Sequence, residues 1–489
     1  MKKGYIPKEE RKKILFLCDD IRLHSGIGTM AREIVTNTAH HFNWVNLGAA
    51  VNHPEQGKAF DLSPEVNTLI NIPDSSVKVI PWNGYGDEKV VRQLIDLEKP
   101  DAIMHFTDPR YWKWLYRMEK EIRTKIPMIF YTIWDDLPYP MYNRDFYRSD
   151  DLLLCISKQT KNLVKNVLRD YPKKDWQIQY VPHGIDERKF YPIINDLEFE
   201  TFKDKFFEEE EYDFVVFWNN RNIRRKNPGD VITSWRIFTD QLPKDKAEKC
   251  LLIMHTDKVD QNGTDLPEVI KTACDPERCK VKFTHGKCDD KHLNYYYNLA
   301  DAQFMMTDNE GWGLSLTEGI MAGNMAIAPV QGGMQDQMRF EDENGDWIDF
   351  TTEFPTNSNG KYKNHGEWAI PMWPKTRSLK GSPPTPYIYA SQVDIEDAGL
   401  ALLKCYNLGK EEITRRGLIG REWLMSEEAQ MTAANMGQNF IDYINVLFKK
   451  WEPLKKFTIE KVVDEDTTYN PNLIQYTPEF KQKLKEVLK

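Results

Sequence analysis

Short apolar runs alternate with amphipathic helical stretches along most of this chain, and this alternation limits its possible folds more than any other feature. In the first half the apolar runs lie at 14–18, 44–48, 77–80, 102–106, 128–132, 152–156 and 178–181. Strands that alternate with helices form βαβ units, so we expect an α/β fold with a mostly parallel sheet. Such sheets bind ligands beyond the carboxyl ends of their strands.

A second α/β unit follows the first. The alternation stops across 191–211, an acidic stretch with no strand pattern, and it resumes with apolar runs at 214–218, 251–255, 281–284, 303–306 and 325–328. A length of 489 residues also exceeds what one hydrophobic core usually serves. The sequence therefore predicts a first domain over 1–190, a linker over 191–211 and a second domain over 212–430.

The stretch 339–393 interrupts the pattern of the second domain. It is rich in Gly, Pro, Trp and Tyr and has neither a helical nor a strand period. Long loops of this kind are usually functional or disordered, and the aromatic side chains, Trp373 among them, argue against disorder. A small satellite core and a contact surface for a substrate explain these rings equally well. Beyond it, we expect 431–489 to form a C-terminal helix and tail that return to the first domain.

Composition excludes several classes of protein. A content of 40% hydrophobic and 29% charged residues is typical of a globular chain. The sequence contains no run of 18 apolar residues, so it predicts no membrane-spanning helix. The formal charge of −9 lowers the expectation of a nucleic-acid partner, although local basic patches can act alone. The first residues lack the apolar segment of a secretory signal, and seven irregularly spaced cysteines indicate free thiols in a reducing cytoplasm.

A glycine-containing turn follows the first apolar run. Gly26 and Gly28 lie where glycines let a backbone approach a phosphate, at the start of a predicted helix. A tight turn without a ligand explains them equally well. The stretch lacks the complete three-glycine fingerprint of a dinucleotide site, which argues against a dehydrogenase.

Cationic residues follow the predicted strand at 214–218. Arg221 and Lys226 begin and end a basic stretch that also contains Arg224 and Arg225. A departing nucleoside diphosphate gains negative charge as its glycosidic bond breaks, so fixed cations there lower the barrier. We predict that Arg221 and Lys226 bind a diphosphate, and Arg224 and Arg225 either extend this patch or lie on the surface.

The strongest signal is a pair of carboxylates around a glycine-rich turn. Glu310 and Glu318 lie eight positions apart (310 to 318), and Gly311, Trp312, Gly313 and Leu314 lie between them. Carboxylates accept charge-assisted hydrogen bonds from the hydroxyl groups of a sugar and a ribose. A helix that begins at this turn directs free N–H groups toward an anion.

Together these motifs resemble glycosyltransferase family 4. The Val-Pro-His-Gly-Ile-Asp stretch at 181–186 is similar to the family's VPNGVD signature, with His183 in place of asparagine. The Arg221 to Lys226 spacing resembles its Arg-x4-Lys pair, and 310–323 resembles its E-x7-E motif. The resemblance covers most of 13–450 except the insertion. It implies the GT-B architecture, two Rossmann-like domains with parallel sheets facing across a cleft, and retaining transfer from a nucleotide diphosphate sugar.

The resemblance also implies roles for single residues. In it, Glu310 lies at the transferred sugar and acts in catalysis with Arg221 and Lys226, and Glu318 holds the ribose. The donor-binding set that we predict comprises Gly26, Gly28, Gly286, Gly311, Trp312, Gly313, Leu314, Glu318, Gly332 and Gly333.

One departure from the family concerns the segment 132–138, where many members carry a histidine near the sugar. Here Asp135 is the residue predicted to act in its place. His105, Asp108, Asp136 and Trp373 are candidate acceptor contacts, although a structural role is as plausible for each; His24 is a further alternative to the missing histidine.

The acceptor remains open at this point. A glycan, a protein, a small molecule and a modified DNA base are all compatible with the motifs. The chain resembles glycosyltransferases of large bacteriophages, some of which modify hydroxymethylated bases, and such a protein would act in the host cytoplasm. A nucleotide-sugar epimerase and a non-catalytic binding protein of the same fold are the alternatives, and the oligomeric state is unknown.

A metal is not expected to be required. Cys274, Cys279, His285, Cys288 and His292 include ligand types of zinc, but they form no Cys-x2-Cys pair. The arginine and lysine pair already supplies positive charge for a diphosphate. We therefore predict that no metal or other cofactor is needed besides the nucleotide sugar as donor substrate.

Overall fold

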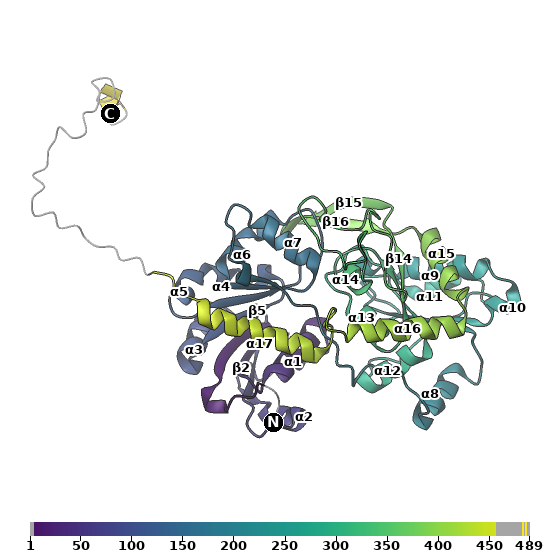
Figure 1. Cartoon of the computed structure of the whole chain (residues 1–489), viewed down its shortest axis with the longest axis horizontal. Coiled ribbons are helices and arrows are strands. Elements are labelled where there is room, and N and C mark those ends of the chain that lie inside the picture. The colour runs from purple at the N-terminus through teal and green to yellow at the C-terminus, as the bar shows by residue number, and fades with distance from the viewer. Residues whose placement is uncertain (1–3, 456–481, 484, 487–489) are drawn as a thin grey trace, which may run out of the picture. The chain divides into compact units, whose positions relative to one another are not determined.

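The computed structural model describes residues 4–455, 482–483 and 485–486. Met1–Pro453 form one compact unit and Leu454–Lys489 a second one, which is described at only a few positions. The predicted C-terminal tail therefore lies largely outside the described residues. The first unit consists of two lobes, each built on its own sheet (Figure 1).

The N-terminal lobe contains a sheet in the order β3-β4-β2-β1-β5-β6-β7-β8, in which every neighbouring pair except β3 and β4 is parallel. Each of the seven predicted strands is present, and the short edge strand β3 was not predicted. The strands are β1 (Lys12–Asp19), β2 (Phe42–Val51), β3 (Phe60–Asp61), β4 (Val77–Asn83), β5 (Ala102–Phe106), β6 (Met128–Thr132), β7 (Leu152–Cys155) and β8 (Ile178–Tyr180).

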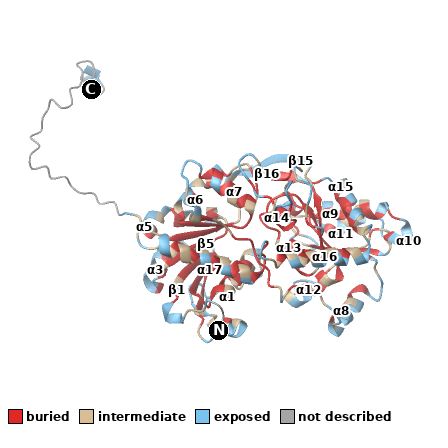
Figure 2. Cartoon of the chain, viewed as in Figure 1, coloured by how far each residue is buried: buried red, intermediate tan, exposed pale blue. Residues whose placement is uncertain are grey.

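Helices cover both faces of this sheet, so its strands are buried (Figure 2). The side chains of Ser25, Asp87 and Ser157 cap the helices that begin after them. The helical segments are η1 (Lys8–Glu10), α1 (Gly26–Thr38), α2 (Ser63–Ile70), α3 (Glu88–Glu98), η2 (Pro109–Trp112), α4 (Lys113–Arg117), α5 (Glu119–Arg123), η3 (Met141–Asn143), α6 (Arg144–Ser149), α7 (Lys158–Val167) and η4 (Asp175–Gln177).

The C-terminal lobe contains an all-parallel sheet in the order β11-β10-β9-β12-β13-β14. This is the doubly wound order, in which the direction of winding reverses between β9 and β12; in the N-terminal lobe it reverses between β1 and β5. Ligands bind beyond the strand ends at such reversals. The strands are β9 (Phe214–Asn219), β10 (Cys250–His255), β11 (Val281–Phe283), β12 (Ala302–Phe304), β13 (Met325–Pro329) and β14 (Ala369–Met372).

The helices of the C-terminal half include one that crosses back to the first lobe. Helix α17 packs against α1, and Ile185 pairs with Thr432 where the chain passes between the lobes. The acidic stretch 191–211 contains helix α8. The segments are α8 (Leu197–Phe207), η5 (Arg224–Lys226), α9 (Pro228–Asp240), α10 (Lys244–Ala247), α11 (Leu266–Ala273), α12 (Asp290–Leu299), α13 (Leu314–Met321), α14 (Met334–Gln337), α15 (Ile395–Tyr406), α16 (Lys410–Leu424) and α17 (Ala433–Lys450).

The insertion 339–393 has more regular structure than its sequence suggests. Strand β14 extends the parallel sheet, and β15 (Thr376–Ser382) pairs with β16 (Thr385–Gln392) in an antiparallel hairpin. Trp368 is buried, stacks on Trp423 with ring centroids 5.0 Å apart, and donates its Nε1–H to the Gln337 carbonyl. Trp373 packs against Phe340. These tryptophans brace the lobe, as the satellite-core interpretation requires.

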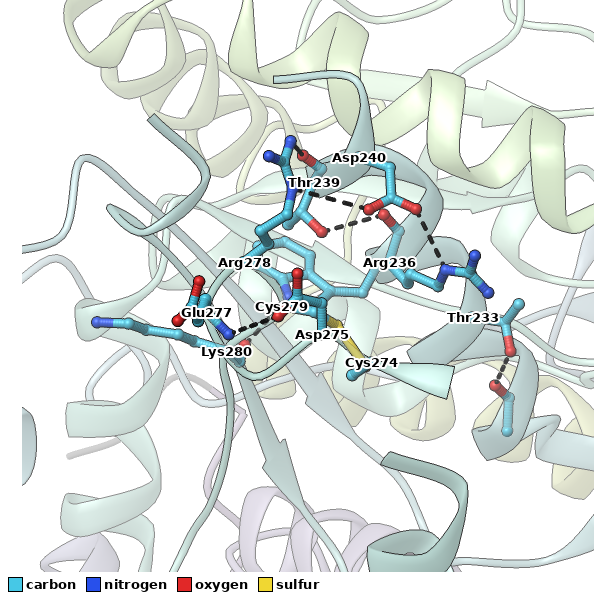
Figure 3. The surroundings of a disulfide bond; sticks show 12 residues. Thr233, Arg236, Thr239, Asp240, Cys274, Asp275, Glu277, Arg278, Cys279 and Lys280 are labelled. Atoms are coloured by element: carbon cyan, nitrogen blue, oxygen red, sulfur yellow. Dashed lines mark hydrogen bonds and ion pairs between the residues drawn. A yellow bond between two sulfur atoms is a disulfide. The ribbon is translucent and has the colours of Figure 1, made fainter. Parts of the chain in front are cut away.

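The cysteines differ from the prediction in one respect. Cys274 and Cys279 form a disulfide in the loop between α11 and β11, so the prediction of free thiols is wrong for these two (Figure 3). Arg278 lies in the same loop and donates to the carbonyl of Thr239 on α9. The disulfide also removes two of the five side chains considered for zinc, and within 4–455 no three His, Cys, Asp or Glu side chains are grouped so as to hold a metal ion.

No helix within the described part of the chain has both the length and the apolar character needed to cross a membrane.

Candidate functional site

A cavity of about 900 Å³ lies between the two lobes, at the carboxyl ends of β1 and β9; we call it the interlobe cavity. It forms where the sheet topology predicts a ligand site. The predicted site residues that line it are Gly26, Asp135, Lys226, Glu310, Gly311, Trp312, Gly313, Leu314 and Glu318.

Two adjacent cations meet one carboxylate in this cavity. The 3₁₀ turn η5 follows β9 and places Arg225 beside Lys226, whose ammonium forms an ion pair with Glu310. The Arg225 guanidinium lies 3.3 Å from the same Glu310 oxygen. Burial lowers the pKa of Lys226, whereas the ion pair with Glu310 favours its charged form. Glu310 thus holds both cations at the cavity wall.

Arg221 does not take part in this group. Its side chain is 65% exposed, its Nε lies 3.2 Å from Asp260, and it does not line the cavity. The structure therefore pairs Lys226 with Arg225 where the family spacing suggested Arg221. The sequence left Arg225 undecided because a predicted loop does not reveal which of its side chains face inward.

Two helices begin at the interlobe cavity. Helix α1 starts at Gly26, and α13 starts after Gly313, whose φ of +88° suits glycine. A Cβ on Gly26 would lie 3.5 Å from Leu314, so the two helix starts approach each other across the cavity. The first turn of a helix has N–H groups without intrahelical partners and carries partial positive charge. Both helix ends therefore favour an anion in the space between the lobes.

The other predicted glycines have mainly packing roles. A Cβ on Gly28 would lie 2.6 Å from the Leu23 carbonyl oxygen, and one on Gly333 would lie 2.6 Å from the carbonyl oxygen of Gly311. Gly332 and Gly333 support the loop of Glu310 from behind and do not line the cavity, and Gly286 is also outside it, although its neighbour Lys287 is a lining residue.

Glu318 lies on α13 and accepts a hydrogen bond of 2.6 Å from the Tyr297 hydroxyl. Burial raises its pKa to about 7. An ionised carboxylate accepts hydrogen bonds from two hydroxyl groups, whereas the protonated form must donate one. Glu318 therefore changes from its protonated to its ionised form near neutral pH.

We expect this titration to control the binding of a ribose-containing ligand. Because the charged form accepts both hydroxyls, affinity should be greatest above pH 8 and fall by up to about tenfold per pH unit below the pKa of about 7. Calorimetry with a nucleoside diphosphate between about pH 6 and 8.5 measures this dependence. Glu318→Gln should bind more weakly and show no such slope; an equal slope in this variant would assign the titration to another group.

The candidate acceptor contacts and the predicted catalytic residue Asp135 are distributed unevenly. Asp135 and Asp108 line a second cavity of about 500 Å³, and Asp135 also lines the interlobe cavity. Burial raises the pKa of Asp135. His105 is only 1% exposed, and Asp136 is also buried and accepts hydrogen bonds from the Leu137 N–H and the Gln159 amide.

His105, Asp136 and Trp373 line neither cavity. A hydrogen bond of 3.0 Å joins His105 to the Tyr116 hydroxyl, and burial lowers its pKa to about 3, so the imidazole is neutral. The structure thus places Asp108, a candidate acceptor contact, and Asp135, the predicted catalytic residue, at cavity linings, and it places the other three candidate acceptor side chains in packing positions.

Several lining residues were not singled out from the sequence. Asn219 and Asn220 follow β9 directly, and their place at a predicted strand end was a usable signal. Two histidines that the sequence did bring up also line the cavity: His24, and His183, which hydrogen-bonds to Tyr131 at 2.7 Å. Lys189 lies across from α13 and carried no recognisable motif.

No protein-family model and no curated protein sequence matches the chain. Solved structures do. A glycosyltransferase from Rickettsia africae is 13% identical with a TM-score of 0.61, covering 90% of this chain and 100% of its own. Sucrose-phosphate synthase from Thermosynechococcus elongatus is 14% identical with a TM-score of 0.61 over 90% and 100% of the two chains. HepE from Anabaena, in complex with UDP and glucose, is 11% identical with a TM-score of 0.60 over 89% and 100%.

The chain has the GT-B fold. The predicted fold class, two Rossmann-like lobes with parallel sheets, is thereby confirmed. The likeness extends over nearly the whole of each related chain, so both lobes of the GT-B fold are present here. The interlobe cavity occupies the space between these two lobes.

Proposed function

We propose that this protein is a retaining glycosyltransferase that moves a sugar from a nucleotide diphosphate sugar to an acceptor hydroxyl. One observation carries the proposal: a single cavity between the lobes of a GT-B fold gathers two cations, two helix N-termini and the Glu318 carboxylate. This is what a nucleoside diphosphate leaving group requires, because charge develops on it as the glycosidic bond breaks. The GT-B neighbours support transfer as the reaction.

Some residues of the interlobe cavity act on the leaving group and others bind the sugars of the donor. Lys226 and Arg225 stabilise the departing diphosphate together with the first turn of α13, and Glu310 positions both cations. Glu318 binds the ribose hydroxyls. Asp135 projects from the N-terminal lobe at the meeting point of the two cavities, where it contacts the transferred sugar.

Retention of configuration follows from the resemblance to glycosyltransferase family 4. UDP-glucose is the donor to test first, because HepE from Anabaena has been solved in complex with UDP-glucose. We propose that no metal is required, since Lys226 and Arg225 supply fixed positive charge beside the diphosphate, and that the protein acts in the cytoplasm. Turnover should accordingly persist in EDTA.

A correct nucleotide sugar should raise the melting temperature. Binding to the folded state alone contributes about 2.7 kcal/mol when the ligand is at a hundred times its Kd. Differential scanning fluorimetry with UDP-, ADP-, GDP- and TDP-sugars measures the shift, and mass spectrometry then identifies products.

The products separate the proposed reaction from its alternatives. A donor that stabilises the protein but is never cleaved would support the non-catalytic alternative, and an epimerised donor would support the epimerase. If no nucleotide sugar or nucleoside diphosphate shifts the melting temperature, the proposal is wrong. Lys226→Ala provides the matched control, since its shift should be much smaller.

A further inference from the structure

The hairpin β15–β16 closes the second cavity, which we call the hairpin chamber. This cavity of about 500 Å³ lies between the ends of β5 and β6 in the N-terminal lobe and the hairpin of the C-terminal lobe. Ser382, Thr385 and Ile388 form its hairpin side. Its volume is within the range of sites for small molecules.

The chamber and the interlobe cavity meet at one place. Ile133, Asp135 and Arg225 line both. A molecule in the chamber therefore lies beside the carboxylate and the guanidinium that face the donor side. Within the insertion 339–393, only residues of the hairpin line the chamber, and none lines the interlobe cavity.

The hairpin β15–β16 lies near the top of the view in Figure 1, and hydrogen bonds to both lobes hold it in place. Toward the N-terminal lobe, the Tyr389 N–H donates to the Leu137 carbonyl at 2.8 Å, and the Tyr142 hydroxyl donates to the Tyr387 carbonyl at 2.7 Å. Toward the C-terminal lobe, the Ser391 N–H donates to the Asp308 carbonyl at 2.8 Å. The hairpin is thus a wall of the chamber, held at both sides.

The charges in the chamber are balanced. Asp108 forms an ion pair with Arg110 and lies 3.4 Å from the Lys380 ammonium of the hairpin, and Arg225 is paired with Glu310. Asp135 is the remaining carboxylate of the lining, and burial raises its pKa. No lining cation is left without an acidic partner, which disfavours an anionic ligand.

One residue that lines the chamber, Asn143, has a buried polar atom without a partner. Asn143 is 1% exposed and its Oδ1 accepts no hydrogen bond. Leaving such an atom unpaired costs free energy, so a ligand hydroxyl that donates to it is favoured. The hydroxyl groups of Thr107, Thr132 and Tyr147 lie on residues of the same lining. This chemistry suits a molecule that carries several hydroxyl groups.

We propose that the hairpin chamber binds the acceptor as one small, neutral, polyhydroxylated unit of about one sugar ring, and that the hairpin β15–β16 limits acceptor size. The inference rests on the proposed glycosyltransferase function and adds to it the acceptor class and the element that selects it. Asn143 is the positioning residue for an acceptor hydroxyl, and Asp135 lies where that acceptor would meet the donor.

The test measures release of nucleoside diphosphate from the best-binding donor with different acceptors. Neutral one-ring compounds (glucose, galactose, mannose, arabinose and inositol) are compared with maltotriose, with glucose 6-phosphate and with hydroxymethylated DNA. At least one one-ring compound should raise release about tenfold over hydrolysis by water, because positioning the hydroxyl removes an entropic barrier. The trisaccharide, the phosphate ester and the DNA should not.

Variants then locate the effect. Ile388→Trp fills the chamber and should abolish the stimulation while donor affinity stays within about threefold of the wild type. Leu379→Trp is the matched control, since Leu379 lies on the same hairpin, is 61% exposed and does not line the chamber. If Ile388→Trp fails to fold, Asn143→Leu also tests whether the acceptor binds in the chamber, and it should increase the KM for the acceptor.

The outcomes distinguish the inference from the function on which it rests. If the donor is hydrolysed but no neutral one-ring compound stimulates release, or if maltotriose, glucose 6-phosphate or DNA stimulates it equally well, the inference is overturned. Unchanged acceptor use by both chamber variants would also overturn it. Absence of donor binding and hydrolysis would instead refute the proposed function.

Discussion

Replacing Lys226 by alanine is expected to lower turnover by about a hundredfold or more, by analogy with the loss of one preorganised transition-state donor. The ammonium is buried at the cavity wall, in an ion pair with Glu310, where its charge is screened less than at the surface. Its removal takes away positive charge from the departing diphosphate and leaves the Glu310 carboxylate with Arg225 alone. Release of nucleoside diphosphate from the donor, followed under saturating and limiting donor, measures the loss.

Comparison among the arginines of the same stretch makes this prediction specific to the structure. Arg225→Ala should also impair turnover, whereas Arg221→Ala should change it only a few-fold, because Arg221 is exposed and paired with Asp260. The family spacing leads to the opposite ranking. A severe loss in Arg221→Ala together with normal turnover in Arg225→Ala would show that the side chains rearrange when the donor binds, and would return the role to Arg221.

Most strands of both lobes were predictable because a buried strand consists of a continuous run of apolar residues. A strand with helices on both faces needs no polar face, so runs such as 14–18 stand out. Strand β14 was not predicted, because Ala369–Met372 is short and contains a proline. Only its pairing with β13 in the structure identifies it as a strand. The hairpin β15–β16 carries an exposed first strand without alternation, so its sequence has no strand period.

The site could be predicted to the level of segments but not of side chains. His105 and Asp108 belong to the same strand end, yet His105 is still within β5 and turns into the core against Tyr116, whereas Asp108 lies beyond the strand and reaches the chamber. Likewise Arg225, and not Arg221, lines the interlobe cavity and lies beside Glu310. Orientation within a loop depends on tertiary contacts that local sequence does not encode.

Gly332 shows most clearly how the structural role of a glycine differs from the role predicted for it. Gly332 was predicted to line the donor sugar, but it lies behind the Glu310 loop at a φ of +51°. A Cβ there would lie 1.8 Å from the carbonyl oxygen of Glu310, which is far inside van der Waals contact. Any side chain at this position must displace that loop.

Gly332→Ala is therefore expected to reduce turnover by about a hundredfold, since displacing a reacting group by about 1 Å can have an effect of that size. The displaced loop carries Glu310, and with it the positions of Lys226 and Arg225. Donor affinity should fall as well, because α13 begins from the same loop. Steady-state kinetics and calorimetry at a temperature well below the melting transition measure both effects in folded protein.

A second glycine separates crowding from backbone strain. Gly409 also has a positive φ, +80°, but a Cβ there would meet no atom within 4 Å. Gly409→Ala therefore carries the strain of an alanine at positive φ without the collision, and it lies at the start of α16, outside both cavities. It should lower the melting temperature modestly and leave turnover unchanged. Equal losses of turnover in the two variants would mean that strain, and not the position of the Glu310 loop, explains the effect of Gly332→Ala.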